Sequence, residues 1–169
     1  MSRLVVLALG SNLGDRAATL QDAVDAVLES PAVTGVAVSP VYETEPVGGP
    51  EQRDYLNAIL LLDTELPSFA LLERAHAVEQ AFGRERTERN GARTLDIDVI
   101  SVGDEVSADP ALTLPHPRAH ERAFVLRPLA DVAPDLVLPG RGRVCELLAA
   151  LPYGAAVHER NDISLRIAS

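Results

Sequence analysis

The sequence predicts an α+β fold in which an antiparallel β-sheet carries two helices on one of its faces. Two observations predict this fold: strand-like apolar runs alternate with segments of helical periodicity, and two consecutive strand-like runs separate the helical segments. The chain has 169 residues and is 47% apolar, which is enough for one buried core. A domain of about 150 residues buries about 68–70% of its unfolded surface. We therefore expect a single domain over residues 1–169.

The first strand is expected at residues 4–9, where an apolar run leads into a turn at residues 10–15. Apolar side chains then recur at helical spacing between residues 19 and 28, before a Ser-Pro pair breaks the pattern. β-Branched residues predict a second strand at residues 33–41. Glycine and proline interrupt that strand, which indicates an edge or a bulge.

The second half of the pattern begins with a loop rich in glycine and proline at residues 44–50, followed by a strong strand at residues 55–62. A helix is expected from residue 67 or 68 to Phe82, and a further strand at residues 94–102. The order β-α-β-β-α-β is that of a ferredoxin-like fold, with both helices packed on one face of the antiparallel sheet. The residues from 103 onward then supply C-terminal additions for the other face.

The C-terminal part contains a short helix expected to end at Arg122 and an apolar run at residues 124–126. Cys145 is the single cysteine, so the chain can form neither an internal disulfide nor a cysteine cage for zinc. It lies in an apolar helical stretch and is expected to be a small core residue. This cysteine usage suits a reducing cytosol, and we expect a cytoplasmic protein.

The charged residues are 25 acids against 15 bases, and every base is an arginine. Without lysine, the chain has neither the phosphate-binding lysine of a Walker loop nor a Schiff-base amine. A net charge of −10 disfavours binding to nucleic acid. No apolar run approaches the roughly 20 residues of a membrane span, so no membrane partner is expected.

Asp96 and Asp98 are the most informative pair of residues. Alternate side chains of a strand share a face, so both carboxylates point the same way with Cα atoms about 7 Å apart. Two hard oxygen ligands on one face suit Mg²⁺ and phosphoryl chemistry. The alternative is an ordinary solvated strand face that happens to carry two acids.

Four arginines precede this strand within ten residues, namely Arg84, Arg86, Arg89 and Arg93. They form a set of planar donors that can converge on a polyphosphate whose metal ions the aspartates hold. Gly91 predicts that the segment is a loop able to close over a nucleotide. The alternative is a group of structural ion-pair partners, although exposed pairs usually contribute only about 0–1 kcal/mol.

His116 stands between two prolines, with Arg122 and Phe124 downstream. The prolines restrict the backbone, so the imidazole can be held towards a phosphate. A simple turn histidine is the alternative, and taken in isolation it is the favoured one.

Tyr55 and Asn57 share a strand face and follow the loop that begins at Thr44. Asparagine offers both a donor and an acceptor, so this pair can read the edge of a flat heterocycle. The alternative is a cross-strand pair at a sheet edge.

Taken together, these segments resemble the 6-hydroxymethyl-7,8-dihydropterin pyrophosphokinases of the folate pathway. The resemblance follows the chain in order and ends near residue 151. The motifs that carry it are Leu9-Gly10-Ser11-Asn12-Leu13-Gly14-Asp15, Tyr42-Glu43-Thr44-Glu45-Pro46-Val47-Gly48, Asp54-Tyr55-Leu56-Asn57-Ala58, Gly83-Arg84-Glu85-Arg86, Gly91-Ala92-Arg93-Thr94-Leu95-Asp96-Ile97-Asp98, Leu114-Pro115-His116 and Arg122-Ala123-Phe124. The Arg-Thr-Leu-Asp-Ile-Asp block with its downstream Pro-His is the most specific of them.

The resemblance implies transfer of the β,γ-diphosphate of ATP to the pterin's hydroxymethyl group, with release of AMP. It implies the substrates ATP and hydroxymethyldihydropterin, and two Mg²⁺ ions at Asp96 and Asp98. Arg84, Arg93 and Asp98 are then the expected catalytic residues. The expected nucleotide contacts are Glu79, Arg86, Arg89, Val99, Thr113, His116 and Arg122. The expected pterin contacts are Thr44, Val47, Tyr55, Asn57 and Phe124. We expect a monomer.

The chain departs from the family pattern at several positions. Asn90 stands where the family typically has tryptophan, and the surrounding loop is one residue shorter. Glu45 and Ala92 replace common prolines, and Pro117 replaces a frequent aromatic residue. None of these changes removes an expected metal ligand or catalytic arginine, so we expect them to tune affinity or loop closure.

Three other classes of protein remain as alternatives. One is a non-catalytic ferredoxin-like sensor that binds a nucleotide or metal, and it differs from an enzyme by releasing no AMP. An RNA-binding sheet is disfavoured by the net charge of −10 and by an aromatic content of 4%. A two-metal phosphohydrolase fits the aspartate pair but does not explain the whole ordered series of motifs.

Overall fold

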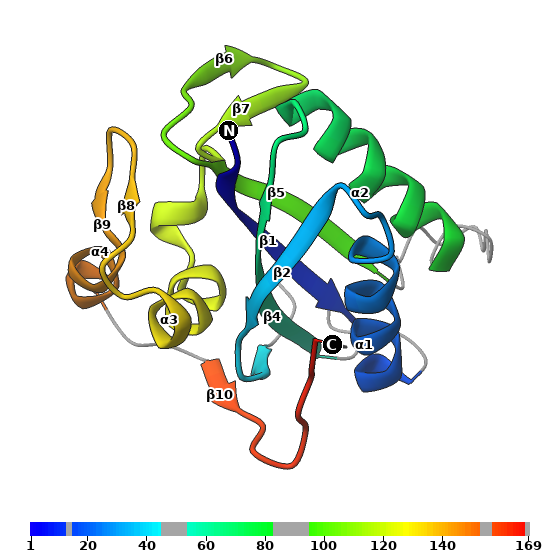
Figure 1. The fold of residues 1–169 in the computed structure, drawn as a ribbon. Helices are drawn as coiled ribbons and strands as arrows, with labels where there is room; N and C mark the ends of the chain where they lie inside the picture. Colours follow the sequence, from blue (N-terminus) through cyan, green and yellow to red (C-terminus); the bar gives the residue numbers. More distant parts are fainter. Residues whose placement is uncertain (13–14, 45–53, 83–94, 153–156, 168–169) are drawn as a thin grey trace.

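The structure is a computed structural model that describes residues 1–12, 15–44, 54–82, 95–152 and 157–167 (Figure 1). Its main sheet has the order β10-β3-β4-β1-β5, with β2 also paired to β4, and every pairing is antiparallel. The strands are β1 (Arg3–Ser11), β2 (Val33–Val38), β3 (Tyr42–Thr44), β4 (Tyr55–Thr64), β5 (Asp96–Val102) and β10 (Val157–Glu159). β1 lies between β4 and β5 and runs through the centre of the molecule.

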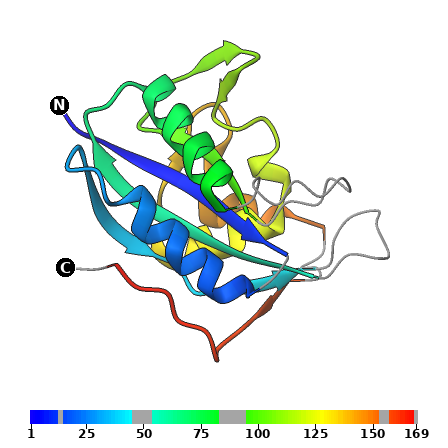
Figure 2. The same cartoon turned by 90° about the vertical axis from the view of Figure 1, so that its right-hand side faces the viewer.

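Two helices, α1 (Arg16–Val27) and α2 (Ser68–Phe82), cover one face of this sheet. Figure 2 shows them side by side in front of the strands. Their apolar stripes close the first core over the alternate residues of the central strands, such as Leu7 and Leu60. Asp15 is the N-cap of α1, and its side chain accepts a hydrogen bond from the amide of Ala18 at 3.1 Å.

The other face is covered by α3 (Ala123–Val132) and α4 (Val144–Ala150), together with the hairpin of β8 (Val137–Leu138) and β9 (Gly142–Arg143). The second core lies here and uses the intervening strand residues, including Val6, Ile59 and Ile100. Cys145 is half-buried on α4. The predicted helix at this point of the sequence is present, but the cysteine is less buried than a core residue.

A smaller hairpin of β6 (Ser107–Asp109) and β7 (Leu112–Leu114) follows β5 and leads to the 3-10 helix η2 (Ala119–Glu121). The short helix expected to end at Arg122 is therefore a single 3-10 turn. α3 begins directly after it and contains the apolar run at residues 124–126. Arg122 ends one element and caps the next, which fixes its position between them.

The strand expected at residues 33–41 ends at Val38, and a separate short strand, β3, begins at Tyr42. Ser39 binds β4 through its amide, which donates to the carbonyl of Ile59 at 2.9 Å, and through its hydroxyl, which accepts from the amide of Ile59 at 2.8 Å. The irregularity expected at Gly35 is confirmed, because the register of β2 on β4 shifts between Gly35 and Ala37. β1 extends to Ser11, past the start of the expected turn.

The last described residues complete the fold at the edge formed by β3. β10 pairs with β3, and residues 160–167 then run below α1, where Ile163, Leu165 and Ile167 pack against the first core (Figure 2). A Cβ atom on Gly35 would lie 2.9 Å from Cγ2 of Ile167, so this close packing requires glycine. No helix among the described residues has both the length and the apolar character needed to cross a bilayer.

Candidate functional site

The candidate site lies at the end of the sheet where β1 finishes and β4 and β5 begin. The register there places Asp96 opposite Gly10, Gly10 opposite Asn57, and Asn57 opposite Tyr42. Directly paired residues of an antiparallel sheet point to the same face, so these four positions form one row on the face that α3 covers further along. Carboxylate, amide and aromatic groups from three strands therefore lie on one surface, with Gly10 of β1 between the carboxylate and the amide.

The paired carboxylates are mounted as the sequence predicts. Leu95, Ile97 and Val99 are 1%, 3% and 4% exposed and belong to the first core, whereas Asp96 and Asp98 are half-buried. The strand is thus anchored through one face and presents its two acids on the other.

The two acids pair in register with residues that have the smallest side chains. Asp96 lies opposite Gly10, and Asp98 lies opposite Ala8. Two carboxylates on one strand face suit Mg²⁺, which commonly uses one or two carboxylates and completes its shell with water and substrate phosphates. Within the described ranges, no group of three or more histidine, cysteine or acidic side chains forms a protein-only metal cage.

Glu79 joins α2 to the edge strand. Its Oε2 accepts a hydrogen bond from the amide of Ile97 at 2.7 Å. This amide points outward from β5, which is an edge strand of the main sheet in the described part of the chain. The contact fixes the distance between α2 and the strand that carries both aspartates.

A pocket of about 330 Å³ opens between α2, β5 and the residues around β7. Its lining brings together five predicted nucleotide or catalytic residues: Glu79, Asp98, Val99, Thr113 and His116. It also includes side chains that the sequence interpretation missed: Leu72, His76, Ile97, Pro110, Ala111, Leu112 and Pro117. His76 is exposed, and it stands one helical turn before Glu79 on the same face of α2. The three-residue spacing of His76 and Glu79 is the sequence feature that could have predicted that His76 lies beside the pocket.

His116 is fixed at the rim of this pocket. Its amide donates to the carbonyl of Ile100 at 2.8 Å, and its Nδ1 accepts from the amide of Arg118 at 3.2 Å. Burial lowers the pKa of His116, Asp98 opposes that shift, and Arg122 and Arg118 add to it. In a neutral ring whose Nδ1 accepts, the proton is on Nε2. The ring therefore offers an N–H donor to an oxygen in the pocket.

Three of the expected pterin residues, Thr44, Tyr55 and Asn57, lie together. Asn57 is 6% exposed, and its Nδ2 donates to Oγ1 of Thr44 at 2.9 Å. Thr44 pairs directly with Tyr55, so the predicted shared face of Tyr55 and Asn57 is confirmed. A Cβ atom on Gly10 would lie 3.3 Å from Oδ1 of Asn57 and 3.5 Å from Cδ2 of Tyr55. Glycine at this position allows both side chains to lie close against β1.

Arg122 and Phe124 lie together at the start of α3. The guanidinium carbon of Arg122 is 5.4 Å from the centre of the Phe124 ring, which is a cation–π distance. The same guanidinium is close enough to His116 to affect its titration. Arg122 therefore lies near the histidine and contacts Phe124.

The remaining predicted site residues lie outside the described part of the chain. They are Val47, Arg84, Arg86, Arg89 and Arg93. The same holds for the family departures at Glu45, Asn90 and Ala92 and for the shorter loop.

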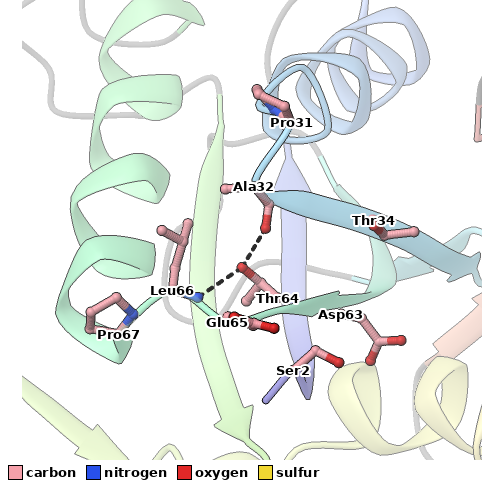
Figure 3. A pocket seen from close by; sticks show the side chains of 9 residues that line it. All are labelled: Ser2, Pro31, Ala32, Thr34, Asp63, Thr64, Glu65, Leu66 and Pro67. Carbon is pink, nitrogen blue, oxygen red and sulfur yellow. Dashed lines mark hydrogen bonds between the residues drawn. The ribbon is translucent and has the colours of Figure 1, made fainter.

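A larger hollow of about 570 Å³ lies at the opposite end of the sheet (Figure 3). It is lined by Ser2, Pro31, Ala32, Thr34, Asp63, Thr64, Glu65, Leu66 and Pro67. Two hydrogen bonds link the segments that line it. The amide of Leu66 donates to Oγ1 of Thr64, and the hydroxyl of Thr64 donates to the carbonyl of Ala32. Its charged groups are carboxylates and it has no arginine, so it does not suit a phosphate. No predicted site residue lines it.

The described residues form a mixed α/β protein with four α-helices and an antiparallel sheet, and one end of that sheet carries two carboxylates and a pocket of about 330 Å³. The model of the 7,8-dihydro-6-hydroxymethylpterin-pyrophosphokinase (HPPK) family matches residues 6–134. The chain belongs to this family.

Curated relatives support the same assignment. The 2-amino-4-hydroxy-6-hydroxymethyldihydropteridine pyrophosphokinase of Pseudomonas aeruginosa is 44% identical over 153 residues, covering 90% of this chain and 94% of that protein. The enzyme of the same name from Methylorubrum extorquens is 47% identical over 145 residues, covering 86% and 91%. The one from Mycobacterium leprae is 47% identical over 161 residues, covering 87% and 82%.

Among solved structures, the HPPK-DHPS of Plasmodium falciparum has a similar fold. The TM-score is 0.70 at 14% identity, and the match covers 88% of this chain. This chain spans 44% of that longer chain. At this identity the likeness concerns the fold alone.

Proposed function

We propose that the protein transfers the diphosphate of ATP to the hydroxymethyl group of 6-hydroxymethyl-7,8-dihydropterin, with release of AMP, as a step of folate biosynthesis. The hydroxyl oxygen of the pterin attacks the β-phosphorus, and the bond from that phosphorus to the oxygen bridging the α- and β-phosphates breaks. AMP leaves with the bridging oxygen, and the hydroxyl proton passes to solvent. The observation that carries this proposal is that Asp98, the pocket of about 330 Å³ and the Asn57–Thr44 pair all lie at one end of the sheet.

The fold that supports this reaction is ferredoxin-like in our proposal. The order of elements from β1 to β5, apart from the short β3, follows β-α-β-β-α-β, and β1 lies between β4 and β5. α3, α4 and the residues around them would be the C-terminal additions on the second face. The whole chain would then act as one pyrophosphokinase domain.

The nucleotide would occupy the pocket between α2 and β5. Val99 and Thr113 line it, and Glu79 stands on its α2 side. His116 would donate from Nε2 to a phosphate or ribose oxygen, and Arg122 would add positive charge beside it. Arg86 and Arg89 are proposed as further phosphate contacts.

Asp96 and Asp98 would hold two Mg²⁺ ions, which when bound offset charge on the phosphates and lower the pKa of the pterin hydroxyl. The residues fit this role, because both acids share a face and have Gly10 and Ala8 beside them. The protein's own part is to fix the carboxylates on a strand buried from behind, so that they need no rearrangement during the reaction. Arg84 and Arg93 are proposed to neutralise the charge that develops during transfer.

The pterin would lie against Asn57, Thr44, Tyr55 and Phe124, with Val47 as a further contact. Asn57 donates one amide hydrogen to Thr44, and its second amide hydrogen and its carbonyl oxygen would pair with the amino-oxo edge of the ring. Phe124 at the start of α3 would cover one face of the ring. Holding the ring in this way places the hydroxymethyl oxygen in line with the β-phosphorus.

We further propose that the protein is a cytoplasmic monomer with no nucleic-acid partner. The composition supports this proposal through its single cysteine and its net charge of −10.

The decisive experiment measures AMP release from ATP, Mg²⁺ and the reduced hydroxymethylpterin, with the pterin omitted as a control. Pterin-dependent AMP release, with the diphosphate recovered on the pterin, is the expected result. Nucleotide binding without AMP release would instead indicate a sensor and overturn the proposal. Pterin-independent release of ADP and phosphate would indicate a phosphohydrolase.

A further inference from the structure

An ion-pair cluster of Glu43, Arg16, Arg160 and Asp162 lies at the end of β3. None of these four residues is a predicted site residue. Glu43 lies between Tyr42 and Thr44, so its side chain points to the opposite face from theirs, towards the start of α1. There Oε2 of Glu43 accepts from Nη1 of Arg16 at 2.8 Å, and Oε1 accepts from Nη1 of Arg160 at 2.9 Å. Both oxygens of one carboxylate thus bind different arginines.

The two arginines come from opposite ends of the chain. Arg16 is the first residue of α1, and Arg160 directly follows β10. Arg160 is itself fixed, because Nε and Nη2 donate to the two oxygens of Asp162 at 2.9 and 2.8 Å, and its amide donates to the carbonyl of Val41 at 2.8 Å. The cluster therefore fastens the last strand of the sheet to β3.

Arg16 also links the two strands that carry the proposed pterin contacts. The same Nη1 that binds Glu43 donates to the backbone carbonyl of Asp54 at 2.8 Å. Glu43 precedes Thr44 at the end of β3, and Asp54 precedes Tyr55 at the start of β4. One guanidinium group thus holds the end of β3 and the start of β4 at a fixed separation.

The cluster is sheltered enough to hold its geometry. The side chains of Arg16 and Glu43 are 15% and 22% exposed, and that of Arg160 is 31% exposed. Partly buried pairs are screened less than surface pairs. Each arginine also has a second acceptor, so neither is a lone flexible contact.

We propose that Glu43, with Arg16 and Arg160, positions Thr44 and Tyr55 for binding of the pterin, so that the C-terminal segment acts on the substrate site through β3. This inference rests on the proposed function, because it uses the pterin pocket assigned there. Glu43 is a positioning residue, because its carboxylate lies behind the strand and does not face the substrate. Its loss therefore affects the pterin and leaves the nucleotide pocket beside β5 unchanged.

The test compares Glu43→Gln with a matched control at the other end of the sheet, Glu105→Gln. Glu105 also uses both carboxylate oxygens. Oε1 accepts from Nη1 of Arg3 at 2.8 Å, and Oε2 accepts from the hydroxyl of Ser68 at 2.9 Å. Like Arg16, Arg3 also donates to a backbone carbonyl, that of Leu66, at 2.8 Å. Its side chain is 33% exposed. Any general effect of losing such a pair on folding appears in both variants.

Equilibrium binding of hydroxymethylpterin and of a non-hydrolysable ATP analogue is measured for each folded protein, together with thermal unfolding. Glu43→Gln is expected to raise the Kd of the pterin by about tenfold while changing that of the ATP analogue by less than about twofold. Glu105→Gln is expected to change neither constant. Arg160→Gln should reproduce the pterin effect, and Arg160→Lys, which keeps a charged donor, should restore part of it.

A pterin Kd unchanged in Glu43→Gln, or raised equally in Glu105→Gln, would overturn the inference while leaving the proposed function intact. A wild-type protein that binds no pterin and releases no AMP would overturn the proposed function, and this inference with it. The wild-type measurement therefore separates the two failures.

Discussion

Gly10 lies directly opposite Asn57 in the sheet, and a Cβ atom on Gly10 would come within 3.3 Å of Oδ1 of Asn57. Asn57 is held from its other side by Thr44, whose hydroxyl accepts from Nδ2 at 2.9 Å. Asn57 is thus confined between β1 and β3. A small displacement of either strand therefore changes the position of its side-chain amide.

Gly10→Ala is therefore expected to raise the KM for the pterin severalfold, because Asn57 must turn away from β1. Overpacking of this kind typically costs about 1–3 kcal/mol of stability, and the amide can move, so we expect the lower end of that range. Steady-state kinetics with each substrate varied in turn checks the result. The KM for ATP serves as the internal control, and an equal rise in both constants would contradict a local effect on Asn57.

Asp98→Asn is expected to lower kcat by about 10²–10³-fold, the usual cost of removing one stabilising group from a transition state. The amide is similar in size, so the free energy of unfolding should change little. Asp63→Asn is the control, because Asp63 is a half-buried carboxylate on β4 at the other end of the sheet. Single-turnover AMP release is measured for both variants over a range of Mg²⁺ concentrations. Near-native turnover of Asp98→Asn at every concentration would refute the metal assignment.

Glu79 tests the link between α2 and the edge strand. Glu79→Gln keeps an oxygen acceptor for the amide of Ile97 and should stay close to wild type in stability. Glu79→Ala removes that acceptor, and a partly buried donor left unpaired costs about 1–3 kcal/mol. Denaturant unfolding measures the difference, with exposed Gln80→Ala on the same helix as a control.

The same Glu79→Ala protein should bind the ATP analogue more weakly, because the pocket between α2 and β5 loses a fixed wall. Stability and affinity equal to those of Gln80→Ala would show that the contact with Ile97 has neither role.

Much of this arrangement is visible in the sequence because its causes are local. Alternation along one strand was enough to place Asp96 and Asp98 on one face, and helical spacing was enough to define the buried stripes of both N-terminal helices. The early end of the strand predicted at residues 33–41 is only partly visible in the sequence. Pro40 marked a break, but the pairing of Ser39 with Ile59 that shapes it depends on tertiary contact.

Long-range electrostatics could not be predicted in the same way. Glu43 and Arg160 are 117 residues apart, and no periodic pattern relates them. The residues after about position 151 carried no family signal, yet β10 completes the sheet beside Thr44. Similarly, Leu72 and His76 join the nucleotide pocket only because α2 packs beside β5.

The Glu43 cluster also predicts a specific dependence of stability on pH. Hydrogen bonding from Arg16 and then from Arg160 lowers the pKa of Glu43 below its ordinary value, although burial opposes the shift. A lowered pKa means that the folded state favours the ionised carboxylate, so the stabilisation is present above the unfolded pKa of about 4.3 and is lost as pH falls through the folded value. Glu43→Gln cannot titrate at this position.

The free energy of unfolding should therefore favour the wild type over Glu43→Gln at pH 7, and the difference should shrink as the pH falls below about 4.3 towards the folded pKa. Urea unfolding at a series of pH values measures this difference directly. Subtracting the variant from the wild type removes the titration of all other carboxylates, which is the same in both proteins. If this difference in the free energy of unfolding stays constant from pH 7 to well below the unfolded pKa, the stabilisation by the arginines does not depend on the negative charge of Glu43.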